Sequence, residues 1–312
     1  MKNAFETIRL TGAFRTHSPL SHIGESVSTT SYLVQDPVVQ PDGSIAEVFC
    51  YSGNAWRGQL RDLMARRVCV AIDRRLPPDG FHLLFSGGRL DMAEKRVDLA
   101  AARQTRSTVP MIALLGGGVG SEILQGRLRV FNSYPVCREA IPVLPEECHA
   151  RAEGIRYGSL TFEKEFSRKD DGKLGWTADL LAETEAPRNI KVADQMRMTS
   201  ELLAPGAELR TAIHGSNVSR VELGCLVAAL HDFVASPFIG GQHNKGHGLV
   251  SLAYGLAADP ADEEGLTIPG FVRVEAEAGF AAAPEALTMM REYEAHLASN
   301  VAAVREVLKC AA

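Results

Sequence analysis

The stretch FIGGQHNKGHGLV, residues 238–250, decides how the rest of this chain is interpreted. Four of its glycines lie within nine residues, separated by Gln, His, Asn and Lys and by no acidic residue. Glycine permits positive φ and lets backbone N–H groups come close to a ligand, while the polar residues suit phosphate, sugar or base edges. The loop fits neither common nucleotide motif, because G-x-x-x-x-G-K-[ST] fails after Lys245 and no strand leads into G-x-G-x-x-G. We expect an anionic ligand other than a mononucleotide here, with a plain helix-to-strand turn as the alternative.

Regular elements surround this glycine loop (Gly240–Gly248) on both sides. Before it, the capping box Ser219-x-x-Glu222 predicts a helix whose apolar residues recur at helical spacing as far as Val234. After it, the pattern predicts strands over 248–255 and 271–275 and a C-terminal helix over about 285–308. The loop therefore connects a buried helix to a strand.

The first part of the chain supplies the remaining elements of the same unit. Residues 6–14 alternate as a strand, and Ser52 is placed to cap a helix that runs to about Val68. Two further strands are predicted over 198–203 and 208–214. The order strand, helix, strand, strand, helix, strand is typical of an α+β, ferredoxin-like (RRM-like) fold. The aromatic base-stacking motif of RRM domains is absent, so recognition of a single strand would need another surface.

The middle third of the chain is less regular. We expect residues 73–156 to form a helical and irregular insertion and residues 157–194 to form a hairpin insertion with a charged tip. Residues 34–44 are rich in turn formers. No linker composition separates these parts, so residues 1–72 and 195–312 are expected to form one unit that carries both insertions.

Composition limits the classes of partner. The 312 residues carry a net charge of −5, so no overall field draws the protein to nucleic acid or to a membrane, although a local basic groove remains possible. Six arginines and two acids lie within residues 57–75, whereas acids outnumber bases ten to four from Asp259 onward. This asymmetry suits head-to-tail self-association, and solvated helix faces explain it equally well.

Other features of the composition indicate a cytoplasmic protein without cofactor or metal. The six cysteines show no metal-ligand spacing and are expected to be reduced. The N-terminus does not resemble a signal peptide, and no apolar run approaches the roughly 18 residues that a membrane span needs.

Three stretches of the sequence resemble a known group when they are taken together. They are THSPLSHIGE (16–25), SGNAWRGQLRD (52–62) and IGGQHNKGHG (239–248). They resemble the RAMP superfamily, and specifically the crRNA-binding backbone subunit of Class 1 CRISPR effector complexes. GNAWRGQLRD, with PGAEL at 205–209, looks most similar to the backbone subunit of type IV systems, the Csf family. The resemblance covers roughly residues 6–70 and 195–255 and is thin between them.

The resemblance implies a fold, a function and partners. Members of this group polymerise as a helical filament along crRNA, held by a ferredoxin-like palm with a fingers insertion (here 73–156) and a thumb hairpin (here 157–194). The thumb flips out bases at intervals, and the guide pairs with the target nucleic acid. The resemblance thus implies a non-catalytic scaffold whose partners are crRNA, further copies of itself and other subunits of the complex, with no membrane, metal or cofactor.

The candidate RNA contacts lie in the three stretches and at the end of the thumb. They are Ser21, His22, Asn54, Arg57, Arg61, Met196, Arg197, Gly240, Gly241, Gln242, Asn244, Lys245, Gly246 and His247. Further cations in the thumb that suit a phosphate backbone are Lys164, Arg168, Lys169 and Lys191, and a solvated hairpin explains them equally well. Arg57 and Arg61, four residues apart, are expected to share an exposed helix face, with pairing to nearby acids as the alternative. Gly58 between them costs up to about 1 kcal/mol within a helix, which makes sense where RNA or another subunit presses against the backbone.

Two enzymatic alternatives remain open on the sequence. In related type III subunits an aspartate in the loop after the first strand cleaves target RNA, and Asp36 lies near the matching place; a turn Asp before proline is the simpler interpretation. A crRNA-processing endoribonuclease would instead use a histidine acid–base site, for which His17, His22, His243 and His247 are available. The run GGGVG at 116–120 suggests a nucleotide loop only as an alternative to a turn.

Overall fold

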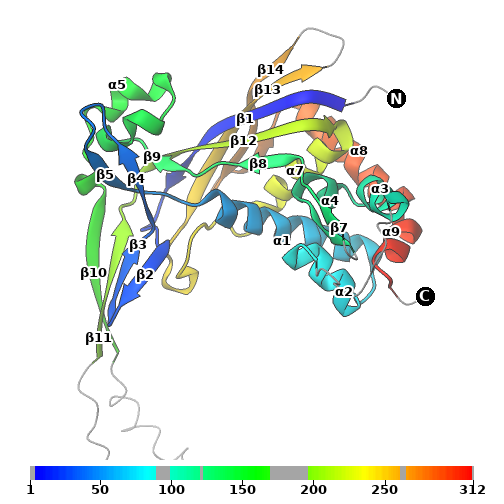
Figure 1. Cartoon of the computed structure of the whole chain (residues 1–312), viewed down its shortest axis with the longest axis horizontal. Helices are drawn as coiled ribbons and strands as arrows, with labels where there is room; N and C mark the ends of the chain where they lie inside the picture. Colours follow the sequence, from blue (N-terminus) through cyan, green and yellow to red (C-terminus); the bar gives the residue numbers. More distant parts are fainter. Residues whose placement is uncertain (1–3, 89–98, 120–121, 169–195, 261–264, 311–312) are drawn as a thin grey trace, which may run out of the picture.

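A seven-stranded antiparallel sheet forms the centre of the molecule in a computed structural model, which describes residues 4–88, 99–119, 122–168, 196–260 and 265–310 (Figure 1). Strand β1 (Ala4–Thr16) lies in the middle, between β12 (Glu208–Ser219) and β13 (Val250–Pro260). The order across the sheet is β15-β14-β13-β1-β12-β8, and β9 also pairs with β12. The other strands are β8 (Leu128–Val130), β9 (Tyr134–Pro135), β14 (Leu266–Glu275) and β15 (Gly279–Ala282).

Two long helices cover one face of this sheet. Helix α1 (Gly53–Ile72) begins at Ser52, whose hydroxyl accepts from the Ala55 N–H, and α7 (Arg220–Phe233) begins with the predicted capping box. Trp56 lies where the two helices meet the sheet, because its ring contacts Phe14 edge-on and its indole N–H donates to the Tyr254 hydroxyl. Both helices are thus anchored by local caps and by apolar burial, as their sequences predict.

The predicted C-terminal helix is two helices, α8 (Pro284–Ser299) and α9 (Val301–Val307). The break falls at Asn300, whose side-chain amide donates to the His296 carbonyl at 2.7 Å. An asparagine side chain that bonds to the backbone competes with helix continuation, which explains the difference from the sequence pattern.

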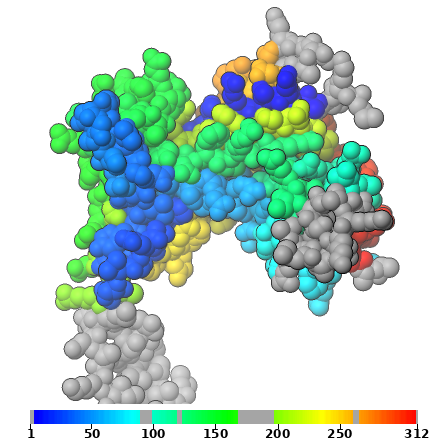
Figure 2. Space-filling model, viewed as in Figure 1, coloured from blue at the N-terminus to red at the C-terminus, as the bar shows by residue number. Residues whose placement is uncertain are grey.

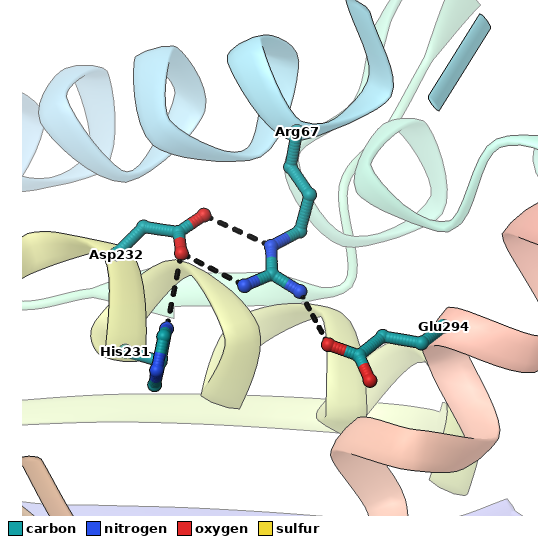
Figure 3. Close-up of polar contacts among 4 residues, drawn as sticks. All are labelled: Arg67, His231, Asp232 and Glu294. Carbon is teal, nitrogen blue, oxygen red and sulfur yellow. Dashed lines mark hydrogen bonds and ion pairs between the residues drawn. The ribbon is translucent and has the colours of Figure 1, made fainter. Parts of the chain in front are cut away.

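Arg67 braces three of the helices (Figure 3). Its guanidinium, on α1, donates to both carboxylate oxygens of Asp232 at 2.8 and 2.9 Å and to Glu294 on α8 at 2.7 Å. His231 Nδ1 donates to Asp232 Oδ1, one of these two oxygens, at 3.1 Å. Burial raises the pKa of Asp232, but the hydrogen bonds from Arg67 and His231 outweigh it and hold that pKa below its ordinary value.

The sequence predicts that residues 198–203 form the second strand of the main sheet. That prediction is wrong, because the place next to β12 is occupied by β8. Residues 196–203 do form a strand, β11 (Met196–Leu203), but it pairs along its length with β10 (Thr161–Arg168). The chain crosses between sheets in the turn 204–207, so β11 belongs to a separate four-stranded sheet, β10-β11-β3-β2, whose other strands are β3 (Thr30–Leu33) and β2 (Ile23–Val27). Strand β10 pairs with one edge of β11 over eight consecutive residue pairs, and β3 pairs with the other edge at Thr199 and Ser200, so β11 is not available to pair with β12.

The rest of the chain forms short elements around these sheets. Residues 34–44 are not simply turns, because β4 (Gln35–Val39) and β5 (Ile45–Phe49) form a hairpin. A small second core lies under it, built around Val38, Val48 and Cys137. In Figure 2 strands β2 to β5 gather on the side of the molecule away from α2 (Pro78–Phe81) and α9.

The bounds of the remaining elements are as follows: η1 (His82–Ser86), α3 (Leu99–Thr108), α4 (Pro110–Leu115), β6 (Gly117–Val119), β7 (Glu122–Leu124), η2 (Arg138–Val143), η3 (Glu146–Cys148), α5 (His149–Ala152), η4 (Tyr157–Ser159) and η6 (His243–Lys245). None of the helices in the described ranges is long and apolar enough to cross a membrane. Within the same ranges, no group of three or more His, Cys, Asp or Glu side chains is placed to hold a metal ion.

Candidate nucleic-acid interface

The three stretches singled out in the sequence meet in space. The Gly241 N–H donates to the Ser21 carbonyl at 2.6 Å, and the Gly248 N–H donates to the Pro19 carbonyl at 2.8 Å. From α1, the Gln59 side-chain amide donates to the Phe238 carbonyl at 2.6 Å. The loop after β1, the first turns of α1 and the glycine loop therefore form one connected structure.

Positive φ shapes the glycine loop at four places. Gly240, Gly246 and Gly248 have φ of 78°, 77° and 89°, and Gln242 has φ of 59°. A Cβ on Gly240 would clash with the Ser21 carbonyl, and one on Gly248 would clash with the Ile239 carbonyl. Gly246 faces open space. Two of the four glycines are thus required by close approach of the chain to itself, and Gly246 leaves its backbone accessible.

A hollow of about 560 Å³ lies between these stretches. His22, Gly58 and Gly240 are among the residues that line it, together with Asp62 and Arg66. A Cβ on Gly58 would meet nothing within 4 Å, so α1 presents bare backbone to this hollow. The lining carries both signs of charge, which makes it suited to shape recognition rather than to strong attraction of phosphate.

The expected exposed face of Arg57 and Arg61 is wrong. Arg61 is only 6% exposed, and its guanidinium donates to the carbonyls of Leu115 and Gly116 at 3.0 and 2.9 Å. It also donates to the Leu84 carbonyl at 3.3 Å, and Arg57 donates to the Leu115 carbonyl as well. Burial, and to a smaller extent the charge of Arg57, lowers the pKa of Arg61 to about 10.

The reason for this inward orientation is the end of helix α4. The last carbonyls of a helix have no partner within the helix and carry partial negative charge, so they attract cations. Gly116, with φ of 72°, ends α4 beside α1 and aims these carbonyls at the two arginines. Arg57 and Arg61 therefore hold α4 against α1.

A cationic cluster does form at the junction of the glycine loop and the β10–β11 hairpin. Lys245 of the loop lies 4.0 Å from the centroid of the Phe166 ring, and Lys164 of β10 lies 5.5 Å from it. Both lysines are exposed. Glu163 and Glu165 alternate with Lys164 along β10 and so point to the other face. We call Lys164, Phe166, Lys245 and His247 the lysine cluster.

His247 is the buried member of the lysine cluster. It is 2% exposed, its ring lies 6.1 Å from that of Phe166, and neither ring nitrogen has a hydrogen-bond partner among the described residues. Burial, and after it the charges of Lys164 and Lys245, lowers the pKa of His247. The imidazole is therefore neutral at neutral pH, with one donor and one acceptor free.

The other predicted contacts are spread around this junction. Ser21 is fully buried, and its hydroxyl finds no partner in the described part of the chain, so it does not present a surface group. His22 is half-buried against Tyr51, with a ring separation of 5.1 Å, and burial lowers its pKa. Asn54 and Asn244 are exposed, whereas Gly241 and Gln242 are half-buried.

The two contacts predicted at the end of the thumb lie on β11. Arg197 is exposed opposite Ser167. Met196 pairs with Arg168 at the end of the strand, and its side chain lies outside the described residues, as do positions 169–195. Phe166 was not singled out in the sequence; the alternation Lys164–Phe166 along one face of a strand is the pattern that would have indicated it.

The carboxylate of Asp36 is held by hydrogen bonds from side chains of this chain. It lies in strand β4, not in a turn, and accepts hydrogen bonds from the Asn132 amide at 2.8 Å and the Tyr134 hydroxyl at 2.7 Å. Burial raises its pKa, but the hydrogen bonds from Tyr134, Cys50 and Asn132 outweigh this and lower it. The carboxylate is thus ionised and fixes the segment between β8 and β9.

The run GGGVG at 116–120 begins at the end of α4 and enters β6, and Gly120 lies outside the described residues. A Cβ on Gly116 would clash with the Leu124 carbonyl, so the close approach there is between parts of this chain.

Comparison with known proteins gives a structural likeness. No family model and no curated protein matches this sequence. A solved chain described as "Type IV-B CRISPR Complex" is similar in structure, with a TM-score of 0.56 and 19% sequence identity, over 79% of this chain and 90% of that chain. This chain therefore shares its fold with a component of a type IV-B CRISPR complex.

Proposed function

We propose that this chain is the crRNA-binding backbone subunit of a type IV CRISPR effector complex and that it is not catalytic. Many copies polymerise along one guide RNA in the cytoplasm, together with other subunits, and present the guide for pairing with target nucleic acid. The structural likeness over most of both chains supports this proposal. So does the chain order β1, α1, β8, β12, α7, β13 with sheet order β13-β1-β12-β8, which is that of a ferredoxin-like palm. In this proposal the β10–β11 hairpin is the thumb.

The observation that carries the proposal is the lysine cluster. Its two ammonium groups come from two segments far apart in the sequence, the glycine loop and the hairpin, and converge on one aromatic ring. When RNA binds, these ammonium groups move to phosphates and the face of Phe166 becomes available for a base. His247 is buried beside Phe166, so in this proposal its neutral imidazole meets a 2′-hydroxyl, which is both donor and acceptor, only when the Phe166 ring moves to stack on a base.

This arrangement contacts backbone and sugar and reads no base edge. Sequence specificity then belongs to the guide, as in guide-directed recognition generally. Binding is accordingly insensitive to spacer sequence and falls steeply with salt.

The test is the nucleic acid that the full-length protein carries through purification. We expect RNA in the wild type, detected by the absorbance ratio at 260 and 280 nm and sized after extraction. The control Lys309→Gln, which removes an exposed lysine from the segment after α9, is expected to carry the same RNA. Lys164→Gln combined with Lys245→Gln is expected to lose most of this RNA while its circular dichroism is unchanged. A wild-type protein free of nucleic acid, or a double variant as fully loaded as the wild type, contradicts the proposal.

An endoribonuclease of the same superfamily is the competing function. It predicts cleavage of complementary RNA by the purified complex and loss of cleavage in Asp36→Asn. We expect intact target RNA in both, because Asp36 is already engaged by Asn132 and Tyr134.

A further inference from the structure

The main sheet has a second face, which α1 and α7 do not cover. Along β1, Ile8, Leu10 and Phe14 are buried beneath the helices, so Arg9 points to the opposite face. The register of the sheet places Arg9 directly opposite His214 of β12, and His214 directly opposite Arg129 of β8. Directly paired residues of an antiparallel sheet point to the same face, so these three side chains form a row across three strands.

The two arginines of this row are free to attract anions. Arg9 and Arg129 are exposed, and neither has an acidic partner among the described residues. His214 lies between them and stays uncharged, because burial and the two neighbouring arginines lower its pKa.

The acids on or beside the same face are already engaged. Glu208 pairs with Arg151 at 2.9 Å, and Glu147 pairs with Arg210 at 2.8 Å. Asp259 accepts from the Thr7 hydroxyl. Glu208 and Glu147 are therefore neutralised by other arginines, whereas Asp259 keeps its negative charge beside Thr7, so the positive potential of the row rests on the unpaired charges of Arg9 and Arg129.

An aromatic hollow lies next to the row. Phe131 follows β8, is 44% exposed, and meets the His214 ring edge-on at a centroid distance of 4.7 Å. Both rings line a hollow of about 760 Å³, whose other walls include Pro142 and Val143. Ala212 also lines the hollow, and its small side chain leaves room for a flat ring over the strands. The volume is within the roughly 300–1,000 Å³ of small-molecule sites and exceeds what one base needs.

We propose that this face is a second binding site for single-stranded nucleic acid, with phosphates over Arg9 and Arg129 and a base held in the hollow against Phe131. An acidic peptide would satisfy the arginines but would leave the aromatic hollow without a flat ring to stack on it. The site is separate from the lysine cluster: Arg9 is seven residues from Thr16, the end of β1 next to the glycine loop, which corresponds to roughly 23 Å of strand. The inference does not rest on the proposed function, because it concerns other residues.

The test measures binding of a short fluorescent oligothymidylate to the full-length protein by anisotropy over a range of salt concentrations. Arg9→Gln with Arg129→Gln is expected to weaken binding about tenfold or more and to reduce the slope of log affinity against log salt by about 1.4, since each phosphate contact to a single strand contributes about 0.7. Phe131→Ala is expected to weaken binding about tenfold with an unchanged slope, because it removes stacking and no charge. Thermal melting by circular dichroism verifies that each variant is folded.

All variants are made in a Lys164→Gln and Lys245→Gln background, which removes the two cations of the lysine cluster from the measurement. The control is Lys309→Gln in the same background, which removes an exposed cation elsewhere and is expected to leave oligothymidylate binding unchanged. If this control loses binding while the arginine pair keeps it, or if the arginine pair loses binding to polyglutamate and not to oligothymidylate, the proposal is overturned. Failure of the background protein to bind the oligonucleotide, both as purified and after nuclease treatment in high salt, also overturns it. The RNA that the protein carries through purification reports on the proposed function separately.

Discussion

The arginines of α1 and the lysines of the lysine cluster have the same charge and opposite roles. Arg57 and Arg61 turn inward and donate to the last carbonyls of α4, whereas Lys164 and Lys245 remain in solvent over the Phe166 ring. Arginine suits the first place because its planar fork donates several hydrogen bonds at once and is weakly hydrated. A lysine ammonium is strongly hydrated and sits on a flexible stem, which suits transfer to a phosphate. The difference teaches that a pair of cations on a helix indicates neither exposure nor anion binding until its acceptors are known.

The largest expected effect is on Arg61. Arg61→Met removes the donor to carbonyls that remain buried, so we expect the free energy of unfolding to fall by about 3 kcal/mol or more. Urea unfolding followed by circular dichroism measures it. A change below about 1 kcal/mol would show that Arg61 does not hold α4 against α1. The contrast between structural arginines and exposed lysines would then be wrong.

A smaller loss is expected for Arg57, which is half-buried and donates to one carbonyl. Arg57→Gln is expected to lower the free energy of unfolding by about 1 kcal/mol and to leave RNA loading unchanged. The informative contrary result is loss of RNA at unchanged stability, which would place Arg57 on the binding surface after all.

The lysines are expected to show the reverse pattern. Lys164→Gln with Lys245→Gln should leave the free energy of unfolding within about 0.5 kcal/mol of the wild type, because both side chains are exposed. In a titration with guide-length RNA, the slope of log affinity against log salt is expected to fall by about 1.4, which is two phosphate contacts. An unchanged slope together with unchanged affinity would remove the lysine cluster from the RNA path.

The smallest effect concerns His247 and pH. Its pKa is lowered in the folded protein, so below the ordinary value of 6.5 the unfolded chain binds the proton more readily than the folded one. Stability therefore falls as pH drops below 6.5, until the folded imidazole is protonated too. His247→Gln is expected to make the urea midpoint depend less on pH across this range. Part of the dependence will persist, because His22 and His214 also have lowered pKa values; an identical pH dependence in the variant would argue against a buried neutral imidazole at position 247.

The sequence predicted those elements whose causes are local. Strand β1, the Ser52 cap and the capping box of α7 depend on alternation or on residues three apart, and all are confirmed. The positive φ of the glycine loop follows from residue type and is confirmed as well, although Gly240 and Gly248 accommodate the chain rather than a ligand.

What the sequence could not predict depends on pairing between distant segments. Strand β8 has only three residues, and its place in the sheet is set by β12, more than eighty residues later. The inward orientation of Arg61 depends on where α4 ends. One pattern did carry a signal: Arg61 lies in helical register with Ala65, Val68 and Ile72, which are all buried. The lysine cluster joins strand β10 to the glycine loop, and no local pattern connects them.

The central position of β1 has a consequence for synthesis of the protein. Both strands that flank it are encoded some two hundred residues later, since β12 begins at Glu208 and β13 ends at Pro260. At ribosomal rates of about 5–20 residues per second, roughly 12 to 50 s pass between the synthesis of β1 and the completion of β12 and β13. During that time Ile8, Leu10 and Phe14 lie on an unpaired strand of high aggregation potential. We therefore expect the yield of soluble protein to depend on chaperones and on translation speed more than the equilibrium stability of the folded chain would suggest.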